Sequence, residues 1–325
     1  MVQELARPPK LAKGAAPDSA WAYLDGKFVP IRDAKISVMT HAFNYGTGVF
    51  EGIRAYWNAD EGQLYGLHFR EHYRRMLRSC RIMRLNNPHS AEDLVDITVE
   101  LLRKCNYKED CYIRPLTYKS SELIGVRLHN LEDGFTVFAV PFGNYVPIEG
   151  GISAQVSSWR RVDDNAIPAR SKITGSYVNA ALAKTEAEES GFDEAIVLTD
   201  DGHVSEGSAA NLFLVREGTL LTAPASDNIL EGIVRSSIMR IAADEKIPLE
   251  VRRIDRTELY LCDEAFLCGT GVQVSPITSI DRRPVGNGEV GPIARRIARI
   301  YFDAVRAKNA KYRDWLTPIY PSPAR

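Results

Sequence analysis

Short runs of alternating apolar and polar residues dominate the first part of the chain, and such alternation is typical of β-strands. Strand-like runs of this kind occur at residues 21–29, 49–57, 112–118 and 135–140. Two longer segments, 70–84 and 91–105, instead repeat their apolar residues at helical spacing. The first is rich in arginine, which we interpret as the solvated basic face of an amphipathic helix. The mixture predicts a small domain of α and β elements at residues 21–140.

Proline and glycine are concentrated at residues 141–151, which indicates a linker between two domains. After the linker, the apolar pattern predicts strands at 152–159, 195–199 and 210–215. The Asp201-Gly202 pair predicts a hairpin turn between the last two strands. Helical spacing occurs at 175–189, 232–246 and 292–308. We therefore expect a larger second domain at residues 152–325, and we interpret residues 1–20 as an N-terminal extension.

The composition shows no strong bias in charge. At 325 residues, the chain is long enough to bury the cores of two domains. Its net charge of −1, from 41 basic and 42 acidic residues, does not indicate a nucleic acid or an anionic membrane as partner. No segment has the roughly 18 consecutive apolar residues that a membrane helix needs. The five cysteines are odd in number and include no Cys-x-x-Cys, so we expect reduced thiols in a cytoplasmic protein.

Two motifs that could suggest other chemistry have simpler explanations. Residues 286–291 fit G-x-G-x-x-G, but no buried strand precedes them, so we interpret them as a turn before the helix that Pro292 begins. His68 and His72 are spaced i and i+4, but neither an H-E-x-x-H pattern nor a further ligand accompanies them. We therefore predict no metal site. The sequence also lacks G-x-S-x-G and Walker A motifs.

Lys172 and Glu206 are the residues with the most informative chemistry. A lysine amine can form a Schiff base with an aldehyde, and a carboxylate that faces a pyridine nitrogen keeps that nitrogen protonated. The two residues could therefore serve opposite ends of pyridoxal 5'-phosphate. The residue types alone leave a second interpretation open, in which Lys172 is a solvated charge beside a helix start and Glu206 is an ordinary turn residue.

Several motifs around these two residues keep a common order and spacing. They are His41–Arg54, Phe69–His72, Tyr112–Leu116, Ile167–Tyr177, Val204–Phe213, Leu230–Arg235 and Gly269–Gly271. In this series the chain resembles the branched-chain amino-acid aminotransferases, which are fold-type IV pyridoxal-phosphate enzymes. The resemblance spans residues 21–305 and depends on the whole series, because each motif alone is weak. It implies the α+β fold of D-amino-acid aminotransferase, with a small N-terminal domain and a larger C-terminal domain whose barrel-like β core is surrounded by helices.

The resemblance also implies roles for individual residues. Lys172 would hold the cofactor and carry protons, Glu206 would face the pyridine nitrogen, and Tyr177 would hydrogen-bond the phenolic oxygen. Arg70 and Thr270 match the family's phosphate-binding residues, and the amides of a helix that begins near Gly232 would complete that site. The predicted cofactor-binding set is Arg70, Lys172, Tyr177, Glu206, Leu230, Gly232, Ile233, Val234 and Thr270.

The substrate pocket that the resemblance implies has aromatic walls around a few polar groups, which would suit an aliphatic side chain. Gly271 and Val272 match a turn whose backbone amides bind the α-carboxylate, although the family commonly has Ala-Ala there. Arg127 and His129 resemble the carboxylate trap of D-amino-acid aminotransferases, and an exposed mobile loop is the alternative interpretation. The predicted substrate-binding residues are Tyr45, Phe50, Tyr112, Arg114, Arg127, Tyr145, Gly271 and Val272.

We therefore predict an aminotransferase that moves the amino group of L-leucine, L-isoleucine or L-valine to 2-oxoglutarate. Its partners would be small amino acids and 2-oxo acids. The resemblance also implies at least a homodimer in which the neighbouring subunit completes each active site. A D-amino-acid or (R)-amine transaminase is the first alternative, supported by Arg127 and His129. A 4-amino-4-deoxychorismate lyase is the second, and the Tyr112-Ile113-Arg114 motif argues against it.

Overall fold

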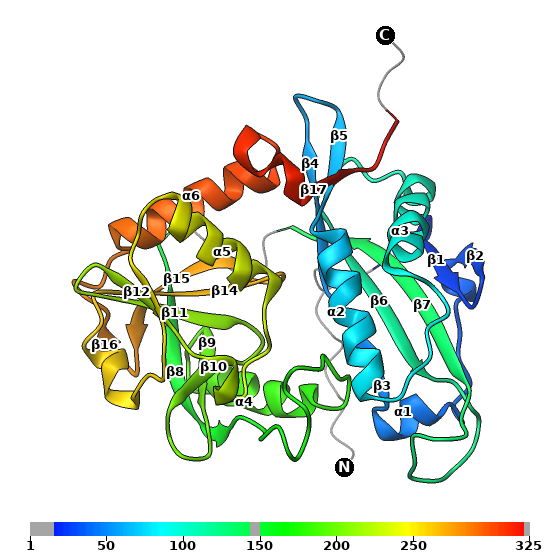
Figure 1. The fold of residues 1–325 in the computed structure, drawn as a ribbon, viewed down its shortest axis with the longest axis horizontal. Coiled ribbons are helices and arrows are strands. Elements are labelled where there is room, and N and C mark those ends of the chain that lie inside the picture. The colour runs from blue at the N-terminus through cyan, green and yellow to red at the C-terminus, as the bar shows by residue number, and fades with distance from the viewer. Residues whose placement is uncertain (1–15, 144–149, 322–325) are drawn as a thin grey trace, which may run out of the picture.

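The computed structural model of the chain describes residues 16–143 and 150–321. These residues form two domains that lie side by side, each built on one large β-sheet (Figure 1). Helices accompany both antiparallel and parallel strand pairs, which agrees with the predicted α+β class. Residues 1–15 of the predicted extension and residues 144–149 of the predicted linker lie outside the described residues.

The first domain is an eight-stranded sheet with helices packed against it. Its elements are β1 (Trp21–Leu24), β2 (Lys27–Pro30), α1 (His41–Tyr45), β3 (Gly48–Phe50), β4 (Ile53–Asn58), β5 (Gln63–Leu67), α2 (Phe69–Ile82), α3 (Ala91–Cys105), β6 (Cys111–Lys119), β7 (Asp133–Pro141) and β17 (Leu316–Pro318). The strand order is β17-β5-β4-β6-β7-β1-β2, and β3 pairs with β6. Both α2 and α3 pack on this sheet because each has one apolar face.

Two predicted strands of this domain are each divided in the structure. Residues 21–29 form a hairpin, because Asp25 and Gly26 both have positive φ, 43° and 91°, as a type I′ turn requires. Residues 49–57 are interrupted between β3 and β4. The sequence did not predict β5 or α1. The β5 strand is buried along its whole length and so lacks alternation, and α1 has only 5 residues.

The second domain is a nine-stranded sheet in the order β10-β9-β8-β15-β14-β11-β12-β13, with β16 beside β15. Its elements are β8 (Ile152–Arg160), α4 (Tyr177–Glu189), β9 (Glu194–Leu198), β10 (Val204–Gly207), β11 (Asn211–Arg216), β12 (Thr219–Thr222), α5 (Ile233–Asp244), β13 (Leu249–Val251), β14 (Glu264–Gly269), β15 (Gln273–Ile280), β16 (Arg283–Pro284) and α6 (Pro292–Val305). The sheet curls back on itself, because four strands separate β10 from β11 in this order although only residues 208–210 separate them in the chain, and Gly207 N–H donates to Ala210 O across that connection at 2.7 Å. This curled sheet agrees with the predicted barrel-like core.

The end of the chain returns to the first domain. After α6, strand β17 pairs antiparallel with β5, so Leu316 lies opposite Leu67 and Pro318 opposite Tyr65 (Figure 1). The prediction from the sequence includes these residues in the second domain, at 152–325. The sequence does not indicate this exchange, because a three-residue strand carries no periodicity of its own.

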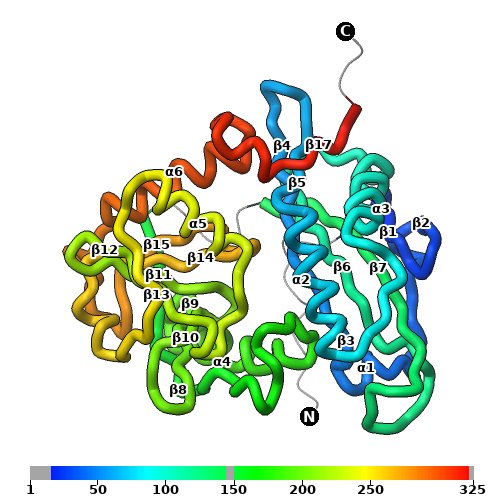
Figure 2. Tube along the Cα trace, in the orientation of Figure 1, coloured from blue at the N-terminus to red at the C-terminus, as the bar shows by residue number. Residues whose placement is uncertain are grey.

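The two domains meet along α2, which lies on the side of the first domain that faces the second (Figures 1 and 2). Tyr56 and Leu67 of the first sheet pack into the apolar cluster beneath α5 and α6. In contrast, α2 carries buried polar residues, namely His72, Arg75 and Ser79. Polar groups are buried at a cost unless they have partners, so this face of α2 indicates a functional site.

Neither a membrane helix nor a metal cluster is found in the described ranges. No helix there is long and apolar enough to cross a membrane. No group of three or more His, Cys, Asp and Glu side chains there could hold a metal ion. The predicted pair of histidines has other partners, since His68 Nε2 lies 3.0 Å from Ser237 Oγ and His72 Nδ1 lies 2.8 Å from Glu51 Oε2.

Candidate active site

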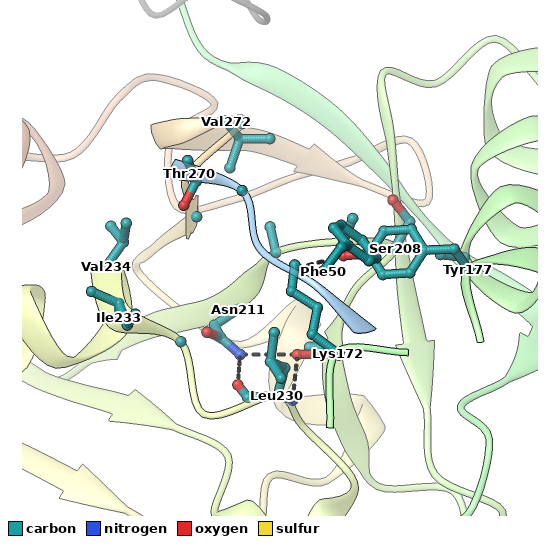
Figure 3. Close-up of a pocket in the computed structure, with 18 of the residues that line it drawn as sticks. Phe50, Lys172, Tyr177, Ser208, Asn211, Leu230, Ile233, Val234, Thr270 and Val272 are labelled. Carbon is teal, nitrogen blue, oxygen red and sulfur yellow. Dashed lines mark hydrogen bonds between the residues drawn. The ribbon is translucent and has the colours of Figure 1, made fainter. Parts of the chain in front are cut away.

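A cavity of about 580 Å³ lies between the two domains, and both of them line it. The first domain contributes residues of β3, β6 and α2, and the second contributes the β10–β11 connection, the start of α5 and the turn after β14. Figure 3 shows Lys172 reaching into this space, with Thr270 and Val272 on one side and Asn211 and Leu230 on the other. All residues of the predicted cofactor-binding set except Arg70 line the cavity.

Lys172 is held in the cavity by contacts that its segment makes with the first domain. Its backbone N–H donates to Ser79 Oγ at 3.3 Å, and Phe50 N–H donates to its carbonyl at 3.0 Å. Its Nζ donates to the Oη atom of Tyr177, the first residue of α4, at 2.6 Å. Backbone contacts on one side and a phenol on the other therefore hold this amine in place.

Glu206 is a buried carboxylate that also lines the cavity. The β10–β9 register shifts between Val204 and Glu206, and such a bulge re-aims the side chains around it. The Glu206 Oε2 atom accepts from Asn211 Nδ2 at 2.9 Å and from Leu230 N–H at 3.1 Å, and Oε1 lies 3.1 Å from Arg161 Nη2. Burial raises the pKa of Glu206, and the Arg161 guanidinium opposes that rise. A cation or an N–H donor in the cavity would meet an oriented acceptor here.

The structure corrects the predicted role of Arg70. This residue lies on the exposed face of α2, where its Nε pairs with Glu92 Oε1 at 3.0 Å, and it does not line the cavity. Arg75 lines the cavity instead. The physical reason is the helical repeat, which places a residue five positions later about 140° around the helix axis.

Arg75 is buried and its guanidinium is fixed by partners on three sides. Its Nε and Nη2 donate to the two Glu51 carboxylate oxygens, each at 2.7 Å, and its Nη1 donates to Glu231 O at 2.9 Å. Burial alone would raise the pKa of Glu51, but Arg75 and His72 hold it well below its ordinary value. Burial lowers the pKa of His72, so we take its ring as neutral, with the Nδ1 proton donated to Glu51. Because Arg75 binds the carbonyl of Glu231, the residue before the N-cap of α5, its cation lies beside the start of that helix.

The start of α5 supplies the second part of an anion site. Gly232 is its N-cap, so the N–H groups of the first turn, including those of Ile233 and Val234, have no partner within the helix. A Cβ at Gly232 would overlap Asn211 Oδ1, so a larger residue would have to displace the Asn211 side chain, which also hydrogen-bonds Glu206. Thr270 lines the same cavity. Unpaired amides at the positive end of a helix, with a buried guanidinium beside them, suit a phosphate group.

Another part of the cavity holds the predicted aromatic wall. Phe50, Tyr112 and Arg114 line it, and the Arg114 guanidinium lies 4.4 Å from the Phe50 ring centroid. Arg114 Nη2 donates to Tyr112 Oη at 2.8 Å, while its Nε is buried and has no hydrogen-bond partner among the described residues. Gly271 and Val272 also line the cavity, as predicted. The site thus combines apolar surface with one available arginine N–H.

Two of the predicted substrate-binding residues, Tyr45 and Arg127, do not line the cavity, and a third cannot be placed in it. Tyr145 lies outside the described residues. Tyr45 does not line the cavity, and its Oη accepts from Gly125 N–H at 3.2 Å, in the loop between β6 and β7. Arg127 is exposed in the same loop, as is its neighbour His129. The described chain therefore places this loop against α1 and away from the cavity lining.

Sequence reasoning missed two arginines that line the cavity, Arg75 and Arg161. A signal existed for the first, because His72, Arg75 and Ser79 are spaced i, i+3 and i+7 and so share one helix face. The plain amphipathic interpretation of α2 obscured it. Arg161 comes directly after β8 and has no comparable signal, because only the tertiary fold brings it to Glu206.

Comparison with known proteins identifies the family to which this site belongs. The family model described as Amino-transferase class IV matches residues 48–280. A probable branched-chain-amino-acid aminotransferase of Aquifex aeolicus (strain VF5) is 48% identical over 301 residues, which are 92% of this chain and 97% of that protein. The chain belongs to the branched-chain-amino-acid aminotransferases of class IV.

Solved structures of other branched-chain aminotransferases share the fold over almost the whole chain. The enzyme of Thermoproteus uzoniensis, solved with norvaline, has a TM-score of 0.90 and 45% identity, and covers 93% of this chain and 100% of that one. The enzyme of Thermobaculum terrenum, solved in its PLP-form (holo-form), has a TM-score of 0.89 and 33% identity, and covers 94% and 99%. The predicted family and the predicted fold of this aminotransferase are therefore confirmed.

Proposed function

We propose that this aminotransferase transfers the amino group of L-leucine, L-isoleucine or L-valine to 2-oxoglutarate, with pyridoxal 5'-phosphate as cofactor. The observation that carries the proposal is the position of Lys172 Nζ in a cavity that also contains the buried Glu206 carboxylate and the anion site of Arg75 and α5. Similar proteins that are named branched-chain-amino-acid aminotransferases support the choice of substrate.

The residues present fit this cofactor. Arg75, Thr270 and the first amides of α5 would hold its phosphate, and Glu206 would hold its pyridine nitrogen as the protonated cation. Burial raises the pKa of Glu206, but the Arg161 guanidinium opposes that rise, and a protonated pyridine nitrogen beside the carboxyl group would favour its charged form further. Leu230, in the same lining, would cover one ring face, and Tyr177 would donate to the phenolic oxygen.

Once bound, the cofactor would supply an electron sink for the bonds at the substrate's Cα. Lys172 would then remove the Cα proton of the amino-group donor and, in the second half-reaction, supply the Cα proton of the new amino acid. Lys184 also lines the cavity, but its amine is paired with Glu188 and Glu194, whereas the Lys172 amine contacts only the Tyr177 hydroxyl among the hydrogen bonds and ion pairs of the described residues. The Tyr177 hydroxyl, 2.6 Å away, sets the direction of that amine. Closure of the site between two domains keeps water away from the reacting atoms.

The aromatic wall must accept two kinds of side chain, because the donor is aliphatic and the acceptor carries a second carboxylate. Phe50 and Tyr112 offer apolar surface to the first. Arg114 would bind the second, since its guanidinium lies against this wall and its Nε has no partner among the described residues. The α-carboxylate that both substrates share would lie at Gly271 and Val272.

One assay tests this function against its main alternative. The purified holoenzyme is incubated separately with L-leucine, D-alanine and (R)-1-phenylethylamine, and the visible absorption of the cofactor is followed. We expect rapid loss of the aldehyde band with L-leucine only. Conversion by D-alanine or the amine without conversion by L-leucine would instead establish the D-amino-acid or (R)-amine alternative.

Replacing Arg75 should release the cofactor, whereas replacing Arg70 should not. A charge-assisted hydrogen bond contributes about 1.5–3 kcal/mol, so Arg75→Met should weaken cofactor binding roughly ten- to hundredfold. Arg70→Met, on the exposed face of the same helix, should change it less than about twofold. The measurement is the cofactor dissociation constant from fluorescence titration of the apoprotein. Equal losses for the two variants would contradict our assignment of the phosphate site.

For Arg127, we expect Arg127→Ala to leave kcat/KM within about twofold for L-leucine, because the residue is exposed and lies outside the cavity lining. Steady-state kinetics with L-leucine, 2-oxoglutarate and D-alanine check this. A loss of about ten- to hundredfold that is limited to 2-oxoglutarate or D-alanine would show that Arg127 binds a carboxylate, as in the alternative function.

We infer that the enzyme forms at least a homodimer. The loop of Arg127 and the neighbouring α1 expose a cluster of apolar side chains, of which Phe43 is 69% and Val126 89% exposed. The cluster comprises Ile36, Val38, Met39, Phe43, Ile124 and Val126. Apolar clusters of this kind mark protein interfaces, and a second copy would also bring this loop to another subunit's cavity. Sedimentation should give at least twice the 36.3 kDa of one chain, and an active monomer would refute the inference.

We also infer a cytoplasmic location. All five cysteines are free in the structure, and such thiols persist in reducing compartments. Cell fractionation of the native host tests this, and recovery of the protein outside the cytoplasmic fraction would contradict it.

A further inference from the structure

Arg54 on β4 is a buried arginine whose guanidinium donates to four backbone carbonyls and also lies 4.9 Å from the Phe142 ring centroid. It is 1% exposed. Its Nε donates to Thr270 O at 2.8 Å, and its Nη2 donates to Gly271 O at 3.2 Å. On the other side, Nη1 donates to Phe142 O at 3.1 Å and Nη2 to Gly143 O at 3.0 Å. Within residues 16–143 and 150–321, no carboxylate forms an ion pair with it. A buried cation without such a counter-charge is costly, which suggests a task beyond packing.

The contacts with Thr270 and Gly271 fix the direction of two peptide groups. These residues belong to the turn between β14 and β15, which is closed by the pairing of Gly269 with Gln273. The described chain has no cis peptide bonds, so each carbonyl points opposite to the N–H of the next residue. Because the carbonyls of Thr270 and Gly271 point at Arg54, the N–H groups of Gly271 and Val272 point away from it, and both of these residues line the cavity.

We propose that Arg54 is a positioning residue that holds this turn with its amides directed at the substrate's α-carboxylate. The cation also polarises both peptide groups, which makes their N–H groups stronger donors. The same guanidinium binds Phe142 and Gly143, so it ties the end of the first domain to the turn of the second. This inference rests on the proposed function, because it assumes that a carboxylate occupies the cavity.

Only arginine has the shape that this arrangement requires. Its planar guanidinium presents five N–H donors at fixed angles, whereas lysine has three donors on a single nitrogen. Lysine at position 54 would keep the positive charge but could not bind carbonyls on two separate segments at once. Arg54→Lys therefore separates the effect of charge from the effect of turn geometry.

The test compares Arg54 variants with a matched interdomain arginine. Arg306 also joins the domains, since its Nη1 donates to Trp57 O at 3.1 Å and its Nη2 pairs with Asp110 Oδ2 at 2.8 Å, but it does not line the main cavity. Holoenzymes of wild type, Arg54→Met, Arg54→Lys and Arg306→Met are titrated with 4-methylvaleric acid, an unreactive carboxylate. Its dissociation constant is read from the change in cofactor absorption, and the melting temperature of each protein is recorded.

We expect Arg54→Met to bind the acid about ten- to hundredfold more weakly than wild type, with partial recovery in Arg54→Lys and less than about twofold change in Arg306→Met. Affinity in folded Arg54→Met equal to that in Arg306→Met would overturn the inference, even if both variants melt at lower temperature. If Arg54→Met does not fold, Arg54→Lys decides in the same way. Failure of the wild type to bind the acid or to react with L-leucine would instead refute the proposed function.

Discussion

Lys172→Ala is expected to reduce kcat by at least about 10³-fold, because one amine serves both as the attachment point of the cofactor and as the proton carrier. Lys184→Ala provides the matched control. Lys184 also lines the cavity, but its Nζ pairs with Glu194 Oε2 and Glu188 Oε1, each at 3.4 Å, so we expect a change of less than about fivefold. Steady-state rates with L-leucine and 2-oxoglutarate measure both effects.

Borohydride reduction adds a test of Lys172 that does not depend on turnover. The wild-type holoenzyme should be yellow, and reduction should remove the visible band and leave the cofactor covalently attached to the peptide that contains Lys172. Peptide mapping by mass spectrometry locates the attachment. An adduct on Lys184 or on any other lysine would remove the central assignment of the site.

Glu206→Gln is expected to slow the first half-reaction by about 10²-fold or more while cofactor affinity changes less than about tenfold. An amide cannot hold the pyridine nitrogen in its protonated form, so the cofactor becomes a weaker electron sink. The phosphate contacts at Arg75 and α5 are unchanged, and they contribute most of the cofactor's affinity. Single-turnover rates with L-leucine and titration of the apoprotein measure the two quantities separately.

Glu194→Gln is the control for this substitution. Glu194 is also buried and lines the same cavity, but its Oε1 accepts from Ser208 Oγ at 2.6 Å and from Ala195 N–H at 2.8 Å. We expect its single-turnover rate to stay within about tenfold of wild type, because those contacts are structural. If Glu206→Gln reacts as fast as wild type, Glu206 does not face the ring.

The sequence supported the most detailed conclusions where function depends on short local motifs. The segments around Lys172 and Glu206 predicted the chemistry and the family, and the glycine at 232 predicted a helix start, which the structure places at Ile233. Helical and strand periodicity also located α2, α3, β6 and β7 close to their actual bounds. These features could be predicted because each one depends on neighbouring residues along the chain.

The pattern of neighbouring residues could not predict whether Arg70 or Arg75 lines the cavity. Both are arginines on one amphipathic helix, and only the packing of α2 between the domains decides which of them is buried. The pairing of β17 with β5 is similar, because three residues cannot specify a strand partner without the rest of the sheet.

By itself, the sequence therefore determined the fold class, the family and the types of residue that carry out the chemistry. These follow from motifs whose order and spacing can be read directly along the chain. The tertiary structure alone decided which partner each of three arginines has. These partners lie far away in the sequence, namely Glu51 for Arg75, Glu206 for Arg161 and the carbonyl of Thr270 for Arg54. Such contacts depend on how two domains pack, and burial then makes each of them strong enough to orient a reacting group.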